Sequence, residues 1–481
     1  MTDTSMTGTE TRAPLPLSLA LLPVATLFAG IAGGAAAFGF GGESLLLALL
    51  LAAAVAAIVA RSRGHGWAEV QAAAGRLFAD ALPAILILLA IGALLGSWMF
   101  AGTIPLLVVL GIDLVSPQWM ALTAFLATAL MSVVSGTSWG SAGTIGVATM
   151  GAAEAMGLPL APVAGAVVSG AYFGDKLSPI SDMTNITAIG AGAELYAHIR
   201  HMMATSLPPA LIALAAYALL VPGASLAGAS PAGAIRAELV ALFAPGWWAA
   251  LPLLVALVGI GMRWPPAPVI VGSAVVALVV GVAVNGFPAA GAVHAFVGGF
   301  ALDQVAPGFA ASEQFAGLVE RGGLNAMAPT LVFILAAFLL AAGMEVSGAL
   351  DALLARLLAA VRGAFGLVAA TMAAGATMVG ITSHGGVTAL VVGGLFRPSY
   401  AERDLAPENL SRALADSVTV TEPLMPWTVS ALFMASTLGV ATLAYAPWAV
   451  FCWLGPVFGL LMALRHRLTG KGLKPAADPA G

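Results

Sequence analysis

The sequence predicts an all-α polytopic membrane protein, an inverted repeat of two five-span halves, each with a re-entrant hairpin and a broken transmembrane helix. Of its 481 residues, 60% are hydrophobic and 8% are charged, whereas about 25% of residues in soluble domains are charged. Apolar segments of about 17 to 25 residues, the length that crosses a bilayer, recur along the chain. Hydroxyl-rich turns and interruptions containing Asp and Pro follow in the same order in both halves.

The N-terminal region predicts two membrane spans behind a short polar segment. Residues 1–14 are polar and are expected to form a disordered cytoplasmic N-terminus, and spans are expected at 17–40 and 44–60. Arg61 and Arg63 follow the second span. Because cytoplasmic loops concentrate Lys and Arg, this loop and the N-terminus are both predicted to be cytoplasmic.

A hydroxyl-rich turn indicates the first re-entrant hairpin, at 117–151. It follows an expected interfacial helix at 67–81 and a span at 83–101. Two short apolar pieces, 117–134 and 139–151, are joined by a turn of small and hydroxyl residues: Ser135, Gly136, Thr137 and Ser138. These residues are expected to lie at a tip that dips into the membrane.

The first broken helix is predicted at 158–193, where Asp175, Lys176 and Asp182 interrupt an apolar region. Each such group costs about 2.5 to 3.5 kcal/mol at mid-membrane, so their presence favours a functional role. Pro179 removes an amide donor and biases Ser178 away from helical angles. A break of this kind survives in lipid where it lines a protein-enclosed cavity. The alternative is a Pro-kinked helix end at the membrane surface.

The rest of the chain repeats these features. The first half ends with a span at 203–221 and an interfacial segment at 222–244. The second half contains spans at 248–262 and 267–284, an acidic connection to about 325, a span at 327–345, an interfacial helix at 351–362, a hairpin at 365–396, a broken helix at 412–443 and a last span at 447–464. Its hairpin turn contains Thr382, Ser383 and His384, and its broken helix carries Asp416, Thr421 and Glu422 beside prolines.

These elements divide the chain into a first transmembrane repeat at 15–245, a second at 246–465 and a basic cytoplasmic tail at 466–481. Inverted repeats with paired discontinuous helices are typical of secondary transporters whose site lies at the repeat interface near the bilayer midplane. Chance hydropathy symmetry is the alternative.

Four motifs then carry a resemblance to a known family. SGTSWGSAGTIGVATMG at 135–151, SGAYFGDKLSPISDMTN at 169–185, LSRALADSVTVTEPLMPW at 410–427 and LGVATLAYAPW at 438–448 resemble the NhaC family of Na+/H+ antiporters. The similarity covers about residues 15–465. Met183 stands where the family has a hydroxyl, and Val420 and Glu422 depart from its second motif. Relatives in this family also exchange organic acids such as malate and lactate, so the resemblance leaves the substrate open.

The candidate site is a set of carboxylates and oxygen donors at the breaks and hairpin tips. Na+ sheds its water where several oxygens replace it, and burial and a neighbouring cation shift a carboxylate's pKa in opposite directions, so Na+ and H+ compete for one group. Asp175 and Asp182 are the expected ion and proton carriers and transient Na+ ligands. The expected oxygen donors and second-half counterparts are Ser178, Thr184, Asn185, Ser135, Thr137, Ser138, Asp416, Thr421, Thr382 and Ser383.

Several alternatives stay open at this site. Asp175 and Lys176 could form a purely structural ion pair, or Lys176 could itself titrate. The Ser and Thr hydroxyls could instead bond to their own helices or cap helix ends. His384 could relay protons near neutral pH, or its ring could hydrogen-bond to a backbone carbonyl.

The function predicted is exchange of Na+ for H+ across the cytoplasmic membrane, with both termini cytoplasmic and a homodimer possible. The alternative is ion-coupled transport or exchange of a small organic acid or amino acid. An enzyme is disfavoured because no nucleotide-binding loop, HExxH motif or catalytic triad is visible, and no cofactor or nucleic-acid partner is expected. The single cysteine, Cys452, excludes an internal disulfide.

Overall fold

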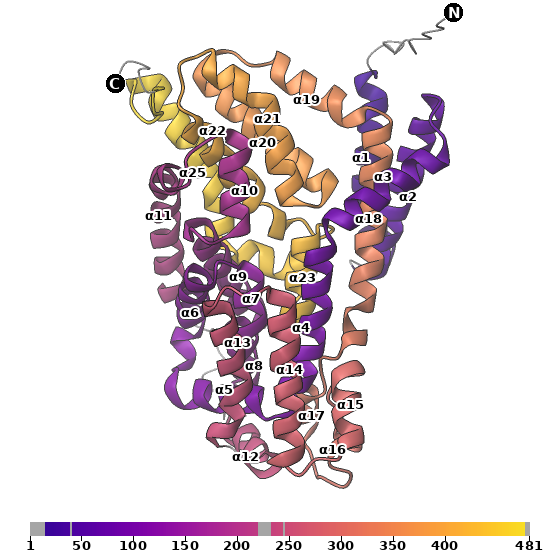
Figure 1. Cartoon of the computed structure of the whole chain (residues 1–481), viewed down its shortest axis with the longest axis vertical. Helices are drawn as coiled ribbons and strands as arrows, with labels where there is room; N and C mark the ends of the chain where they lie inside the picture. Colours follow the sequence, from indigo (N-terminus) through magenta and orange to yellow (C-terminus); the bar gives the residue numbers. More distant parts are fainter. Residues whose placement is uncertain (1–14, 39–40, 220–231, 244–245, 477–481) are drawn as a thin grey trace, which may run out of the picture. The chain divides into compact units, whose positions relative to one another are not determined.

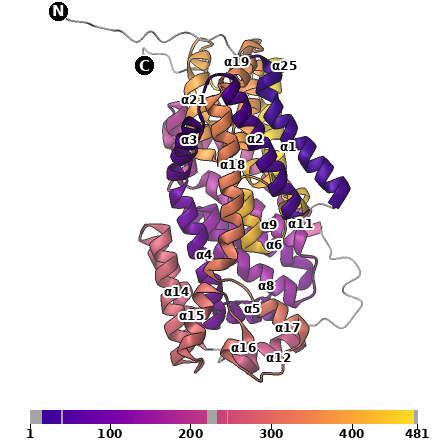
Figure 2. The same ribbon diagram turned by 90° about the vertical axis from the view of Figure 1, so that its right-hand side faces the viewer.

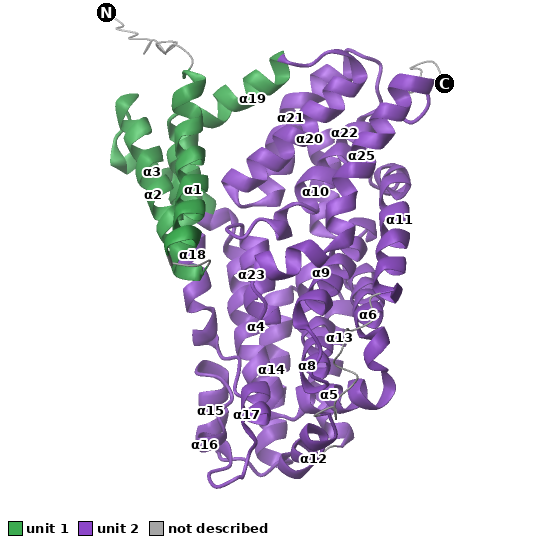
Figure 3. Cartoon of the chain, turned by 180° about the vertical axis from the view of Figure 1, so that it is seen from behind, with its two compact units in different colours: residues 1–77, 336–359 green, residues 78–335, 360–481 purple. Residues whose placement is uncertain are grey.

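The computed structural model describes residues 15–38, 41–219, 232–243 and 246–476 (Figure 1). Within these residues the regular secondary structure is helical, apart from an isolated β-bridge between Leu405 and Pro475. The predicted disordered segment 1–14 and the end of the basic tail lie outside the described residues. The chain divides into two compact units, residues 1–77 with 336–359 and residues 78–335 with 360–481 (Figure 3).

The first unit contains the N-terminal helices and one later helix pair. Its elements are α1 (Leu17–Phe38), α2 (Gly42–Ser62), most of α3 (Trp67–Asp80), the second half of α18 (Ala328–Val346) and α19 (Ala349–Ala359). α1 packs on α2 and α19. Arg76 of α3 forms a 2.9 Å ion pair with Glu345 of α18. α3 covers the segment predicted to be an interfacial helix.

The second unit begins with the helices around the first hydroxyl-rich turn: α4 (Leu82–Phe100), α5 (Thr103–Leu114), α6 (Met120–Ser135), α7 (Ser138–Ser141) and α8 (Val147–Ala155). α6 ends at Ser135 and is followed by Gly136, whose left-handed φ of 68° reverses the chain at low cost because glycine has no Cβ. α7 then continues through a π-helical turn at Ala142–Gly146 into α8. α6 packs against both following pieces.

The next segment is a helix interrupted once. α9 (Leu160–Leu177) and α10 (Asp182–Ala191) are separated by 178–181. Ser178 has an extended backbone, with φ −81° and ψ 123°, as Pro179 requires of its predecessor. The predicted break therefore occurs where the sequence places it.

α9 packs closely on α6 because Gly170 and Gly174 leave room for the α6 backbone. A Cβ at Gly170 would meet the Phe125 carbonyl oxygen. Ser132 of α6 donates to the Ala171 carbonyl at 2.6 Å across the same contact. Glycines four residues apart with interhelical hydroxyl bonds are a common way to join membrane helices.

The remaining helices complete the second unit. They are α11 (Leu195–Leu219), α12 (Ala232–Leu242), α13 (Leu251–Gly261), α14 (Pro266–Ala283), α15 (Ala289–Val297), α16 (Leu302–Val305), α17 (Glu313–Val319), α20 (Gly363–Thr382), α21 (Gly385–Ala401), α22 (Pro407–Leu414), α23 (Val429–Leu438), α24 (Thr442–Tyr445) and α25 (Val450–Thr469). Figures 1 and 2 place α21 and α8 toward opposite ends of this unit.

The described residues form a multi-span membrane protein. Eight helices are long and apolar enough to cross a membrane, and up to ten spans result if each of two bent helix pairs counts as one. In one of these pairs, Val429–Leu438 and Thr442–Trp448, the chain bends by 86°. The all-helical, polytopic fold class is therefore confirmed.

Candidate functional site

The carboxylate of Asp175 lies buried at the end of α9, with 4% of the residue exposed. Its Oδ2 accepts a hydrogen bond from the Ser138 hydroxyl at 3.0 Å, and its Oδ1 accepts one from the Ser181 hydroxyl at 2.5 Å. Ser138 is the first residue of α7. Ser181 is the N-cap of α10 and also accepts from the Thr184 amide at 3.3 Å. The hairpin turn and the helix break therefore hold this carboxylate between them.

The hydroxyl and amide side chains around the break satisfy backbone carbonyls. Thr184 donates to the Asp175 carbonyl at 2.9 Å, and Asn185 donates to the Ser181 carbonyl at 2.7 Å. Ser178 donates to a carbonyl of α6 at 2.8 Å. A break frees such groups, and leaving them unpaired inside a membrane protein is costly. The structure therefore gives these three predicted donors backbone partners rather than a direct contact with Asp175 Oδ1 or Oδ2.

Asp182 lies on the other side of the break, in the first turn of α10, and is exposed. At the first hairpin turn, Thr137 caps α7 by accepting from the Gly140 amide at 3.2 Å. Ser135 lies 3.4 Å from the Ser141 hydroxyl. Ser138 is thus the member of this predicted turn that contacts the Asp175 carboxylate.

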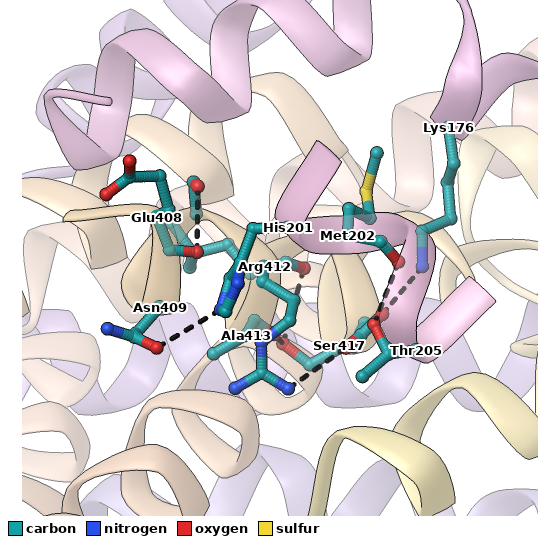
Figure 4. Close-up of polar contacts among 12 residues, drawn as sticks. Lys176, His201, Met202, Thr205, Glu408, Asn409, Arg412, Ala413 and Ser417 are labelled. Carbon is teal, nitrogen blue, oxygen red and sulfur yellow. Dashed lines mark hydrogen bonds and ion pairs between the residues drawn. The ribbon is translucent and has the colours of Figure 1, made fainter. Parts of the chain in front are cut away.

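A second interrupted helix runs from α22 through a π-helical turn at Ala415–Thr419 to α23. A buried cluster of charged side chains joins it to α9. Lys176 Nζ donates to Asp416 Oδ1 at 2.6 Å, and the two side chains are 1% and 0% exposed. Asp416 lies in the π-helical turn that follows α22. Arg412 approaches the other carboxylate oxygen at 3.9 Å; Figure 4 shows Lys176 and Arg412 around this cluster.

The cluster gives Lys176 a partner other than Asp175. Its ion pair is with Asp416, 240 positions along the chain, and not with the adjacent Asp175. Asp416, expected to bind the transported ion, has two cations beside it. Within the described residues, the Nε, Nη1 and Nη2 atoms of buried Arg412 have no hydrogen-bond partner. Two cations and one anion are therefore enclosed together.

The second hairpin turn repeats the hydroxyl chemistry of the first. Thr382 lies 2.8 Å from the Thr388 hydroxyl, and Ser383 donates to the Trp427 carbonyl at 3.4 Å. His384 accepts from the Val387 amide at 3.4 Å as the N-cap of α21. Thr421 donates to the Ser417 carbonyl one turn earlier in its own chain segment.

Two residues outside the predicted set also belong to this region. Ser181 contacts Asp175 directly, and its place before Asp182 is a common N-cap signature. Glu422 is 6% exposed, and its carboxylate lies against Gly385, where an added Cβ would meet Oε2 at 2.5 Å. The sequence places Glu422 close to a break, where it could share the ion site, but does not indicate its burial.

Comparison with known proteins identifies the family. The model of the Na+/H+ antiporter family matches residues 170–464. An uncharacterized Na(+)/H(+) antiporter of Haemophilus influenzae is 37% identical over 401 residues, covering 83% of this chain and 86% of the relative. The Na(+)/H(+) antiporter NhaC of Alkalihalophilus pseudofirmus is 33% identical over 411 residues, 85% and 87% of the two chains.

A further relative carries a different name. The malate-2H(+)/Na(+)-lactate antiporter of Bacillus subtilis is 30% identical over 429 residues, 88% of this chain and 89% of its own. Together with the helical, multi-span fold, these relatives show that the chain belongs to the NhaC family of Na+/H+ antiporters, a family of membrane transporters and not of enzymes.

Proposed function

We propose that the protein exchanges Na+ for H+ across the cytoplasmic membrane by alternating access, with Asp175 binding the two ions in turn. The observation that carries this proposal is the buried Asp175 carboxylate, bonded by Ser138 and Ser181 at a helix break. Two of the relatives described above bear the name Na(+)/H(+) antiporter. A buried carboxylate needs either a proton or a cation as compensation, so the two ions exclude each other there.

The surrounding oxygens suit a hard cation. Na+ loses its hydration shell on entering a protein site, and carboxylate, hydroxyl and carbonyl oxygens replace it. A serine hydroxyl donates to an ionised carboxylate, yet its lone pairs remain able to face a cation. Ser138 and Ser181 would therefore stay in the shell in both states. Thr184, Asn185 and Ser178 keep the break in shape by bonding its carbonyls. The exposed Asp182 fits an entry position better than a buried binding position.

The two hairpin turns support an inverted repeat. In the first, Ser135 pairs with the hydroxyl six positions on, and Thr137 caps the following helix. In the second, Thr382 pairs with the hydroxyl six positions on, and His384 caps the following helix. In each turn, the residue between the paired hydroxyl residue and the capping residue has a left-handed backbone: Gly136 at φ 68° and Ser383 at φ 56°. Within the second unit, the two hairpins lie toward opposite ends (Figure 1).

The positive-inside tendency supports cytoplasmic termini. Arg61 lies in the last turn of α2 and Arg63 follows it, and Arg465 and Arg467 lie in the last turns of α25. The ion pair between Lys176 and Asp416 joins the interrupted helix of the first half to that of the second half. This pair would then hold the two halves in register during the transport cycle.

The test uses inverted membrane vesicles with an imposed pH gradient and a pH-sensitive dye. We expect Na+ to collapse the gradient in the wild type and in Asp303→Asn, which changes an exposed acidic residue. We expect Asp175→Asn to abolish this response at wild-type expression. Full Na+-driven collapse in Asp175→Asn would refute the proposed mechanism.

A second candidate function is exchange of an organic acid or amino acid coupled to ions. Two observations favour it: the buried Arg412 guanidinium without a hydrogen-bond partner in the described structure, and the relative named for malate and lactate. Guanidinium groups bind carboxylates through paired hydrogen bonds. In the same vesicles, a gradient that collapses only when malate, lactate or an amino acid accompanies Na+ would favour this function.

A further inference from the structure

The two interrupted helices match each other at a constant separation of 247 residues. α9 begins at Leu160 and α22 at Pro407. After the breaks, α10 and α23 each contain 10 residues, Asp182–Ala191 and Val429–Leu438. The residue numbers at each of these starts and ends differ by 247. The same shift relates Pro179 to Pro426, one proline in each break.

The local hydrogen bonds follow the same register. Ser181 caps α10 by accepting from the amide three positions on, at 3.3 Å. Thr428, 247 residues later, caps α23 by accepting from the amide three positions on, also at 3.3 Å. Both helices end at a left-handed glycine, Gly192 with φ 73° and Gly439 with φ 69°.

The hairpin turns extend this register beyond the broken helices. Gly136 lies against the backbone of Ile180, and Ser383 donates to the carbonyl of Trp427. Both the turn residues and the break residues in this comparison are again 247 apart. Each hairpin turn therefore contacts the same place in the break of its own half.

This register assigns Glu422, and not Asp416, as the counterpart of Asp175. Both carboxylates are buried, with 4% and 6% of the residue exposed. Ser138 and Gly385, the first residues after the N-caps of α7 and α21, are also 247 apart, and each lies against the carboxylate of its own half. The residue in register with Asp416 is Ser169, which carries no charge.

Charge balance separates the same groups. Asp416 has Lys176 and Arg412 as cationic neighbours. Among the described residues, neither Asp175 nor Glu422 forms an ion pair with a Lys, Arg or His side chain. Gly385, which lies against the Glu422 carboxylate, also lies against Met183 of α10, so the second hairpin turn reaches the first interrupted helix. A buried carboxylate without a cationic partner requires a proton or a bound cation.

From these observations we propose that Glu422 is a second ion-binding carboxylate, which forms one cation site with Asp175 at the meeting of the two hairpin turns. This inference rests on the proposed function and adds to it a residue of the second half. Glu422 lies against Gly385, the first residue of α21, as Asp175 lies against Ser138, the first residue of α7. The site would then bind a monovalent alkali cation between two carboxylates of opposite halves.

The decisive variant is Glu422→Gln, because glutamine keeps the side-chain length and one acceptor oxygen but removes the charge. If Glu422 only fixes the hairpin turn, this variant should bind and exchange Na+ like the wild type. If it binds the ion, we expect the half-saturating Na+ concentration to rise at least tenfold, in both radioactive ²²Na+ binding to purified protein and exchange in vesicles. Asp303→Asn is the matched control.

Glu422→Asp is the second variant and guards against misfolding of the first. It keeps the charge but withdraws the carboxylate by one methylene, so a residue that touches the ion should change the ratio of Na+ to Li+ affinity at least threefold. Wild-type Na+ affinity in Glu422→Gln, or an unchanged ratio in Glu422→Asp, would overturn the inference. With Asp175→Asn still inactive, that result leaves the proposed function standing. A wild type that binds no Na+ overturns both.

Discussion

The buried cluster of Lys176, Asp416 and Arg412 predicts an asymmetric response to loss of its charges. Asp416→Asn would leave two buried cations without an anion. Lys176→Met would leave Asp416 beside Arg412, which already lies 3.9 Å from it. Removing one partner of a buried ion pair costs about 3 to 5 kcal/mol when the other charge is left uncompensated. Losing one buried hydrogen bond to a charged group costs about 1.5 to 3 kcal/mol. Asp416→Asn should therefore destabilise the protein more than Lys176→Met.

These energies convert to measurable shifts in the unfolding temperature. The unfolding entropy is about 2.1 cal/mol/K per residue, which amounts to about 1 kcal/mol/K for 481 residues. Asp416→Asn is then expected to lower the midpoint by about 3 to 5 °C, and Lys176→Met by about 1.5 to 3 °C. When Lys176→Met is already present, adding Asp416→Asn should lower the midpoint by less than it does in the wild type, because Arg412 is then the one cation left in the cluster.

Cys452 provides the assay. It is the single cysteine of the chain and is buried, so a fluorogenic thiol-reactive dye reports unfolding of the detergent-solubilised protein. The midpoints are apparent values compared at one heating rate. Glu345→Gln is the control, since Arg76 and Glu345 are 62% and 44% exposed and such pairs contribute at most about 1 kcal/mol. A midpoint for Asp416→Asn within 1 °C of the wild type, or a larger fall in Lys176→Met, would refute the reasoning.

Three further predictions concern the Asp175 shell, the α6 contact and a helix cap. Ser138→Ala removes a donor to Asp175 and should weaken Na+ exchange in vesicles about tenfold. Thr149→Val is the control and should not weaken exchange, because the Thr149 hydroxyl bonds to carbonyls of the preceding helical turn. Gly170→Ala places a Cβ against the Phe125 carbonyl and should lower the unfolding temperature reported by the thiol dye. Gly394→Ala, at a position with open space around it, should leave that temperature unchanged. Equal unfolding temperatures for the two variants would contradict this packing. Hydrogen bonds from the Tyr196 and Ala197 amides lower the pKa of Glu194. The ionised Glu194 cap therefore stabilises α11 fully at pH values above the ordinary glutamate pKa, and this stabilisation is lost as the pH falls through the lowered pKa of the folded state. Glu194→Gln should thus lower the midpoint temperature of thermal denaturation, followed by light scattering, at neutral pH but not in strong acid.

The sequence predicted the helix breaks well because their causes are local. Pro179 lacks an amide and constrains Ser178, and the structure has an extended Ser178 between α9 and α10. The turns at Gly136 and Ser383 were also predicted from nearby glycine and hydroxyl residues. These features depend on a few adjacent residues and on backbone sterics, which a single sequence displays directly.

The pairing of charges could not be predicted in the same way. Lys176 follows Asp175 in the chain, and an ion pair between them was one of the alternatives that the sequence left open. Adjacent residues on a helix point in different directions, however, and do not face each other. Lys176 therefore contacts Asp416 from another helix. Asp182 was grouped with Asp175 by type and proximity, yet the break separates them and leaves Asp182 exposed.

The sequence by itself determined that this is a multi-span membrane protein of the NhaC family with two interrupted helices, because hydropathy, proline and motif residues act where they stand. The tertiary structure alone decided which acidic groups are paired and which are not. It placed two cations beside Asp416 and left Asp175 and Glu422 buried without a basic partner among the described residues. The physical reason is that the charge balance of a buried carboxylate depends on the rotation and packing of helices far apart in the chain.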